Sequence, residues 1–138
     1  MKNIQSFNRI IVIVAISIIS IFISTKAEAQ CSCPYNVTNN LTCSISVKFV
    51  SVHGTNPVVV CNTLFATIGA GQTQAFACGV GAGCTATPTD CAITILTVNG
   101  GAVNQTVNSG NSPITFINCA GTPGGASATW TSTVTTIN

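Results

Sequence analysis

Charged residues are scarce in this sequence and are concentrated near its start. Of 138 residues, four are Lys or Arg, two are Asp or Glu and one is His. Residues 30–138 carry only Lys48 and Asp90 as formal side-chain charges. One cation cannot release the counterions that drive nucleic-acid binding, and one carboxylate cannot neutralise a calcium ion. The composition therefore excludes nucleic acids, calcium and acidic membrane surfaces as partners of residues 30–138.

The residue patterns that catalysis requires are also missing. Glycoside hydrolysis by the usual route needs two carboxylates, and Asp90 is the only carboxylate side chain after residue 29. A Ser-His-Asp arrangement would have to use His53 and Asp90, and no Gly-x-Ser-x-Gly motif marks a nucleophilic serine. We expect His53 to be a solvated turn residue and Asp90 to cap a turn through backbone hydrogen bonds. The sequence thus predicts a protein that is not an enzyme and uses no cofactor or metal.

Residues 1–29 have the layout of a secretory signal peptide. Lys2 and Arg9 form a basic start, residues 10–23 are almost all apolar, and Ala27 and Ala29 give a small-x-small ending. This apolar stretch is shorter than the ~20 residues that a helix needs to cross a bilayer. We therefore expect cleavage before residue 30, and a secreted protein located outside the cell or at its surface with no further membrane contact.

Cysteine, by contrast, is abundant, and all eight cysteines lie after residue 30. An even number of cysteines in a chain addressed to an oxidising compartment predicts four disulfides, although the spacing does not select a pairing. Zinc sites group thiolates in short Cys-x-x-Cys pairs, and this sequence contains no such pair. We expect bridges among Cys31, Cys33, Cys43, Cys61, Cys78, Cys84, Cys91 and Cys119.

No segment after the signal peptide has the period of an amphipathic helix, whereas several segments alternate apolar and polar residues as strands do. Asn99 and Gly100 form a dipeptide typical of hairpin turns. Short strands separated by turn residues, without a crossover helix, favour an all-β fold. We expect residues 30–138 to form a single antiparallel β-sandwich, for which an immunoglobulin-like topology is one option. The predicted strands are residues 43–52, 58–68, 72–78, 91–98, 102–107, 114–119 and 127–137.

The last predicted strand has the most regular pattern in the chain. In a continuous strand one face would consist of threonines, while the other would turn Trp130 and Val134 inward. A terminal strand at a sheet edge can pair with another chain by strand addition. A threonine array also resembles the surface of ice-binding proteins, although only one row is visible here. The candidate interaction face consists of Thr129, Thr131, Thr133 and Thr135.

Aromatic rings offer a second kind of binding surface, because carbohydrate-binding sandwiches commonly use exposed rings as platforms. Phe49, Phe76 and Phe116 lie on apolar faces of predicted strands and are expected in the core. This leaves Tyr35 and Trp130 as candidate platform residues.

Three segments carry a resemblance to known proteins: residues 31–49 (CSCPYNVTNNLTCSISVKF), 67–73 (TIGAGQT) and 91–95 (CAITI). In these segments the chain resembles small secreted bacterial cysteine-rich β-proteins, a group of uncharacterised function. The resemblance implies a disulfide-bonded β-fold and carries over no functional residue.

Neutral polar side chains must provide most of the contact with water, because residues 30–138 contain 19 Thr, 11 Asn and 8 Ser. A net charge near zero leaves little repulsion between copies of the chain. We therefore expect a secreted, non-catalytic structural or adhesive component of the cell surface or extracellular matrix. Its partner would be a second copy or an extracellular polymer. The alternative is a soluble ligand-binding module for carbohydrate or for ice.

Overall fold

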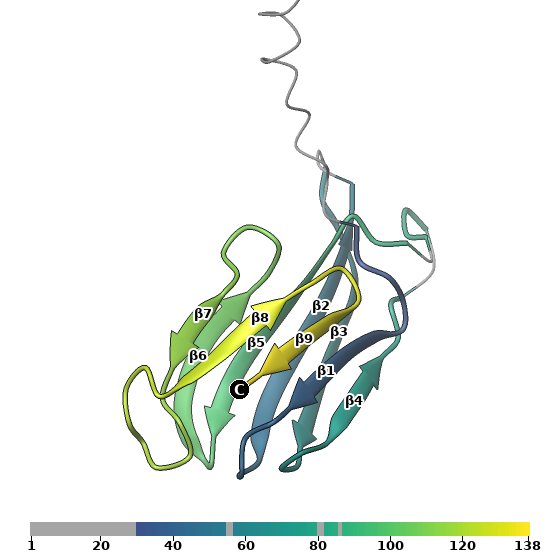
Figure 1. Cartoon of the computed structure of the whole chain (residues 1–138). Helices are drawn as coiled ribbons and strands as arrows, with labels where there is room; N and C mark the ends of the chain where they lie inside the picture. The colour runs from purple at the N-terminus through teal and green to yellow at the C-terminus, as the bar shows by residue number, and fades with distance from the viewer. Residues whose placement is uncertain (1–29, 55–56, 80–81, 86) are drawn as a thin grey trace, which may run out of the picture.

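Two packed β-sheets make up the part of the chain that the computed structural model describes, which is residues 30–54, 57–79, 82–85 and 87–138 (Figure 1). These residues form strands and no helix, so the predicted all-β sandwich is confirmed. The predicted signal peptide, residues 1–29, lies outside the described residues. In the part described, no helix has the length and apolarity to cross a membrane.

The four-stranded sheet is antiparallel and has the strand order β3-β2-β5-β6. Its strands agree with predicted ones to within about two residues at each end. Asn99 and Gly100 have φ angles of 48° and 80° and form the predicted tight turn between β5 and β6. The bounds are β2 (Ile45–His53), β3 (Val59–Ile68), β5 (Asp90–Val98) and β6 (Gly101–Val107).

The five-stranded sheet has the order β4-β1-β9-β8-β7 and is mixed. The first strand runs parallel to the last, so the expectation of a fully antiparallel sandwich was wrong for this pair. In Figure 1 this sheet lies in front of the other, with dark blue β1 beside yellow β9. The bounds are β1 (Tyr35–Asn39), β4 (Thr73–Phe76), β7 (Ile114–Phe116), β8 (Ala126–Trp130) and β9 (Val134–Ile137).

The predicted continuous strand over residues 127–137 was wrong, because the chain turns back on itself within it. β8 and β9 pair antiparallel. Between them the Thr131 hydroxyl accepts the N–H of Val134 at 3.1 Å, and the Thr131 N–H donates to the Val134 carbonyl at 2.8 Å. A threonine hydroxyl that binds nearby backbone groups favours turns over extended strands. β9 then lies between β1 and β8, so both of its edges are paired and it cannot accept an added strand.

Aromatic rings fill the space between the two sheets. Tyr35 of β1 stacks on Phe49 of β2 with ring centroids 5.7 Å apart, and Phe49 stacks on Phe76 at 5.1 Å. Trp130 extends the stack beyond Tyr35 at 6.4 Å. Phe116 is buried as well, so the expected core positions of Phe49, Phe76 and Phe116 are confirmed. Such offset pairs add about 0.5–1.5 kcal/mol each to the burial of the rings.

Four disulfides cross-link the sandwich, and no cysteine is free, as predicted. The Cα atoms of each pair lie 5.7–5.8 Å apart, within the usual range for a disulfide. The bridged residues are separated by 23 to 76 positions in the sequence. Each bridge stabilises the fold by about 2–4 kcal/mol. The pairs are Cys31–Cys91, Cys33–Cys78, Cys43–Cys119 and Cys61–Cys84.

A buried amide joins the end of β1 to the end of β3. Asn39 is fully buried, and the carbonyl oxygens of Cys43, Ile68 and Gly69 lie 2.9, 3.1 and 3.0 Å from its Nδ2. Its Oδ1 accepts the N–H of Leu41 at 3.1 Å. The single side chain thus satisfies backbone groups of the β1–β2 connection and of the end of β3.

We expect Asn39→Ala to lower the free energy of unfolding by about 2–3 kcal/mol, because it leaves buried backbone groups without partners. Denaturant unfolding of the oxidised protein measures the change. The control is Asn36→Ala, on the outer face of the same strand, where we expect a change within about 0.5 kcal/mol. Equal effects of the two substitutions would contradict the role assigned to Asn39.

Candidate functional site

Asp90, the only acidic side chain among the described residues, is held by hydrogen bonds at the start of β5. Its Oδ1 accepts the N–H of Cys91 at 2.8 Å and the hydroxyl of Ser109 at 3.4 Å. Burial raises the pKa of Asp90, while the Cys91 N–H and the Ser109 hydroxyl lower it. The predicted hydrogen bond between Asp90 and a nearby backbone N–H is therefore present.

His53 does not approach Asp90 as a catalytic pair would. His53 is half-buried at the end of β2, not a solvated turn residue as expected. Asp90 is paired with Val52 in the sheet, and adjacent residues of a strand point to opposite faces. The side chains of His53 and Asp90 therefore leave the sheet on opposite sides. Within the described ranges no hydrogen bond links them, and the geometry assembles no Ser-His-Asp device.

Three cysteine sulfurs gather where the segment before β1 meets β5. The Sγ atoms of Cys31, Cys78 and Cys91 lie within 4.8 Å of one another. Each of them belongs to a disulfide, whereas a metal requires the thiolate. The cluster consists of two neighbouring cross-links.

The two candidate platform rings are not exposed platforms. Tyr35 is fully buried, and its hydroxyl donates to the Thr131 carbonyl at 2.9 Å. Trp130 is half-buried, with its indole N–H donating to the Cys91 carbonyl at 2.9 Å. Among the described residues the exposed ring is that of Phe65, which is 68% exposed and was missed. Its neighbours on the same face of β3, Thr63 and Thr67, are the sequence signal that could have placed it outside.

The candidate threonine face does not form one surface. Thr129 is exposed on β8, and Thr131 and Thr133 are exposed in the turn that follows it. Thr135 is fully buried, and its hydroxyl lies 2.9 Å from that of Tyr35. The turn shifts the alternation, so that Thr135 faces the core, contrary to the expectation for a single strand.

A different threonine row crosses the outer face of the five-stranded sheet. Thr38 of β1 is paired with Thr73 of β4 on one side and Thr136 of β9 on the other, and Thr136 is paired with Thr129 of β8. Paired residues share a face, and neighbouring strands lie about 4.8 Å apart. The hydroxyls of Thr38 and Thr73 are 2.9 Å apart. Four strands thus present hydroxyls in register, an array that the linear sequence conceals.

Three exposed apolar side chains, called the apolar strip below, lie along the β3 edge of the four-stranded sheet, with exposed Thr63 between the second and the third. Val58, Val60 and Phe65 are 57%, 62% and 68% exposed. Val60 is paired with half-buried Val52, and Phe65 is paired with Lys48 on β2. These are the large apolar side chains that a partner could cover on this sheet.

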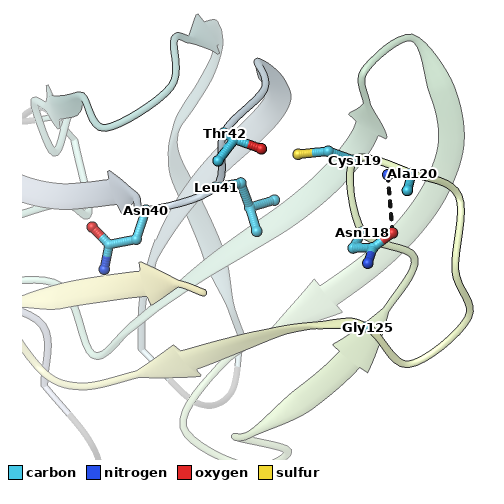
Figure 2. A pocket seen from close by; sticks show the side chains of 7 residues that line it. All are labelled: Asn40, Leu41, Thr42, Asn118, Cys119, Ala120 and Gly125. Carbon is cyan, nitrogen blue, oxygen red and sulfur yellow. Dashed lines mark hydrogen bonds between the residues drawn. The ribbon is translucent and has the colours of Figure 1, made fainter.

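A hollow of about 320 Å³ lies between the loop after β1 and the loop after β7 (Figure 2). One polar atom of each of its asparagines is engaged within the protein: Asn118 Oδ1 accepts the N–H groups of Ala120 and Thr122, and Asn40 Nδ2 donates to Asn138 Oδ1. This volume is near the lower limit for ligand pockets, in which several polar groups usually point toward the ligand. No charged or aromatic residue lines this one. The lining residues are Asn40, Leu41, Thr42, Asn118, Cys119, Ala120 and Gly125.

Comparisons with protein-family models, curated proteins and solved structures find no match to this chain. The two features that stand out are the apolar strip on the four-stranded sheet and the threonine row on the five-stranded sheet.

The buried Tyr35 predicts how stability depends on alkaline pH. Burial raises its pKa well above the ordinary value of 10.0, the hydrogen bond from Thr135 lowers it, and the charge of Asp90 raises it further. Above pH 10 the unfolded chain loses the Tyr35 proton while the folded chain keeps it. The contribution of Tyr35 to stability is therefore complete below pH 10 and is lost as the pH rises beyond it.

Tyr35 is the only tyrosine in the chain, so tyrosinate absorbance reports on this residue alone. We expect the absorbance to appear well above pH 10 and together with unfolding, because the folded protein buries the hydroxyl. Parallel absorbance and circular dichroism titrations measure both events. Tyr35→Phe removes the absorbance change and costs about 1–3 kcal/mol at neutral pH through the lost hydrogen bonds. Ionisation with a midpoint near pH 10 in a folded protein would contradict the burial of this hydroxyl.

Proposed function

We propose that this protein is a secreted, non-catalytic structural or adhesive component of the cell surface or extracellular matrix. It attaches through the outer face of the four-stranded sheet. The observation that carries the proposal is the apolar strip there, in which Val58, Val60 and Phe65 are each more than half exposed. The four disulfides support a location outside the cell, since such cross-links persist in oxidising compartments.

The strip supports attachment because the rest of the surface offers few alternatives. Lys48 and Asp90 are the only formally charged side chains among the described residues, so ionic recognition of a partner would rest on two groups. Burying a large apolar side chain contributes about 1.5–3 kcal/mol, and aromatic residues dominate the binding energy of many interfaces. Phe65 and Val60 are thus the side chains with the most to gain from a partner.

We expect the wild-type protein in the cell-surface or matrix fraction of the producing cells, and the double variant Val60→Ser with Phe65→Ser in the soluble fraction. Both side chains are exposed, so the substitutions remove apolar surface without opening the core. Quantitative immunoblotting of the fractions should show a shift of about tenfold or more. Thr115→Ser, exposed on β7, serves as the matched control and should stay with the surface fraction. Wild-type protein found freely soluble would contradict the proposal.

The alternative, a soluble ligand-binding module, has one observation in its favour, the row Thr73, Thr38, Thr136 and Thr129. A regular row of uncharged hydroxyls on a disulfide-cross-linked sheet can order water molecules. This property favours ice as the ligand. Carbohydrate is less well supported, because Tyr35 is buried and Trp130 is half-buried.

For this alternative we expect the purified protein to inhibit ice recrystallisation and Thr129→Arg to abolish the effect, because a bulky charge interrupts the row at an exposed position. Thr106→Arg, exposed on β6 of the other sheet, should leave the effect intact. Growth of ice crystals unaffected by the wild-type protein would eliminate ice as the ligand.

A further inference from the structure

β3 is the one long edge strand of the described sandwich whose outer edge is unpaired. The other edge strands are β4 with four residues, β7 with three, and β6 with seven. β6 is interrupted at Asn104, which has a φ of 53°, whereas β3 has ten residues. Natural proteins protect long edges with charge, proline or bulges, because an unprotected edge pairs with another chain.

The protection of β3 is confined to its first residues. The register shifts opposite Ser51 and Val52, which leaves Cys61 as the extra residue of β3. Asn62 Nδ2 donates to the Ala77 carbonyl at 2.8 Å, and Gly79 lies so close to the Cys61 carbonyl that a Cβ atom would clash with it. The segment after β4 therefore covers the edge at residues 61–62.

Residues 63–67 have no charge, proline, bulge or covering segment to protect their edge. Their sequence, Thr-Leu-Phe-Ala-Thr, contains no charge and no proline, and their pairing with β2 is regular. Thr63, Phe65 and Thr67 are exposed on the outer face, and Leu64 and Ala66 on the inner face are only half-buried. Both faces of this short tract therefore have surface left to cover.

We propose that β3 pairs with β3 of a second copy of this chain, antiparallel about a two-fold axis at Phe65. This register uses the whole free tract. It places Phe65 opposite its own counterpart, Thr63 opposite Thr67, and Leu64 opposite Ala66. Aromatic pairs and threonine pairs stabilise antiparallel strands when they lie directly opposite, and a two-fold axis makes each contact occur twice. The two four-stranded sheets become one continuous sheet.

Charge does not oppose this pairing. Lys48 is the only cation on the four-stranded sheet, and it is paired with Phe65 one strand in from the edge. In the dimer the two copies of Lys48 are three strand spacings apart, about 14 Å, which exceeds the Debye length of about 8 Å at physiological salt. The proposal rests on the proposed function, since it names the partner that the adhesive surface takes.

The register can be tested with two charge variants at the axis. The secreted protein, with its disulfides intact, is studied by analytical ultracentrifugation over a range of concentrations. We expect wild-type dimers, and at least a tenfold weaker self-association for Phe65→Lys and for Phe65→Glu, because each places like charges directly opposite. An equimolar mixture of the two variants should recover dimers, because opposite charges then meet at the axis.

Thr115→Lys, which adds the same charge to the exposed face of β7, is the matched control and should dimerise as the wild type does. Circular dichroism of each variant verifies the fold. A wild-type protein that is monomeric throughout, or charge variants that associate as strongly as the wild type, would overturn the proposal. A mixture that remains monomeric would overturn the two-fold register at Phe65.

Cell fractionation separates this inference from the function on which it rests. Dimers that are lost on Phe65→Lys but found only in the soluble fraction would refute attachment to the surface and support the pairing. A monomeric protein that stays in the cell-surface fraction would refute the pairing and leave the adhesive role in place.

Discussion

The buried hydroxyl of Tyr35 connects the first strand to the last hairpin, and the sandwich depends on this connection. The hydroxyl donates to the Thr131 carbonyl in the turn and lies 2.9 Å from the Thr135 hydroxyl on β9. The ring of the same residue stacks between Phe49 and Trp130. One side chain therefore fixes the parallel pairing of β1 with β9, positions the turn that ends β8, and fills the centre of the core. The burial that this requires costs little, since both polar contacts of the hydroxyl are made inside the protein.

Much of the architecture could be predicted from local patterns. The alternation in residues 43–52 and 91–98, the turn at Asn99 and Gly100, and the even number of cysteines all led to features that the structure contains. β1 was missed because it has only two apolar residues, Tyr35 and Val37; its third inward position is Asn39, whose amide is satisfied by backbone carbonyls from distant segments. Local hydrophobicity cannot reveal a polar side chain that is buried through long-range partners.

The candidate site was harder to predict, because its geometry arises between strands. The threonine pattern of residues 129–135 suggested one face of one strand, but the Thr131 hydroxyl forms a turn and Thr135 enters the core. The threonines that do align, including Thr38 and Thr73, are far apart in sequence and are brought together by register alone. Phe65 was overlooked although its own strand contained the signal, since Thr63 and Thr67 lie on the same face of β3.

The position of β9 has a consequence for how the chain acquires its structure during synthesis. Its residues, Val134–Ile137, form an interior strand between β1 and β8, although they are synthesised about a hundred residues after β1. Until they arrive, the five-stranded sheet has a gap in its middle and Tyr35 lacks its partner Thr135. Before that point the chain can already form the four-stranded sheet and the β1–β4 pair, because all of their strands precede β9. The two sheets can therefore close into the complete sandwich only after residues 134–137 have been synthesised.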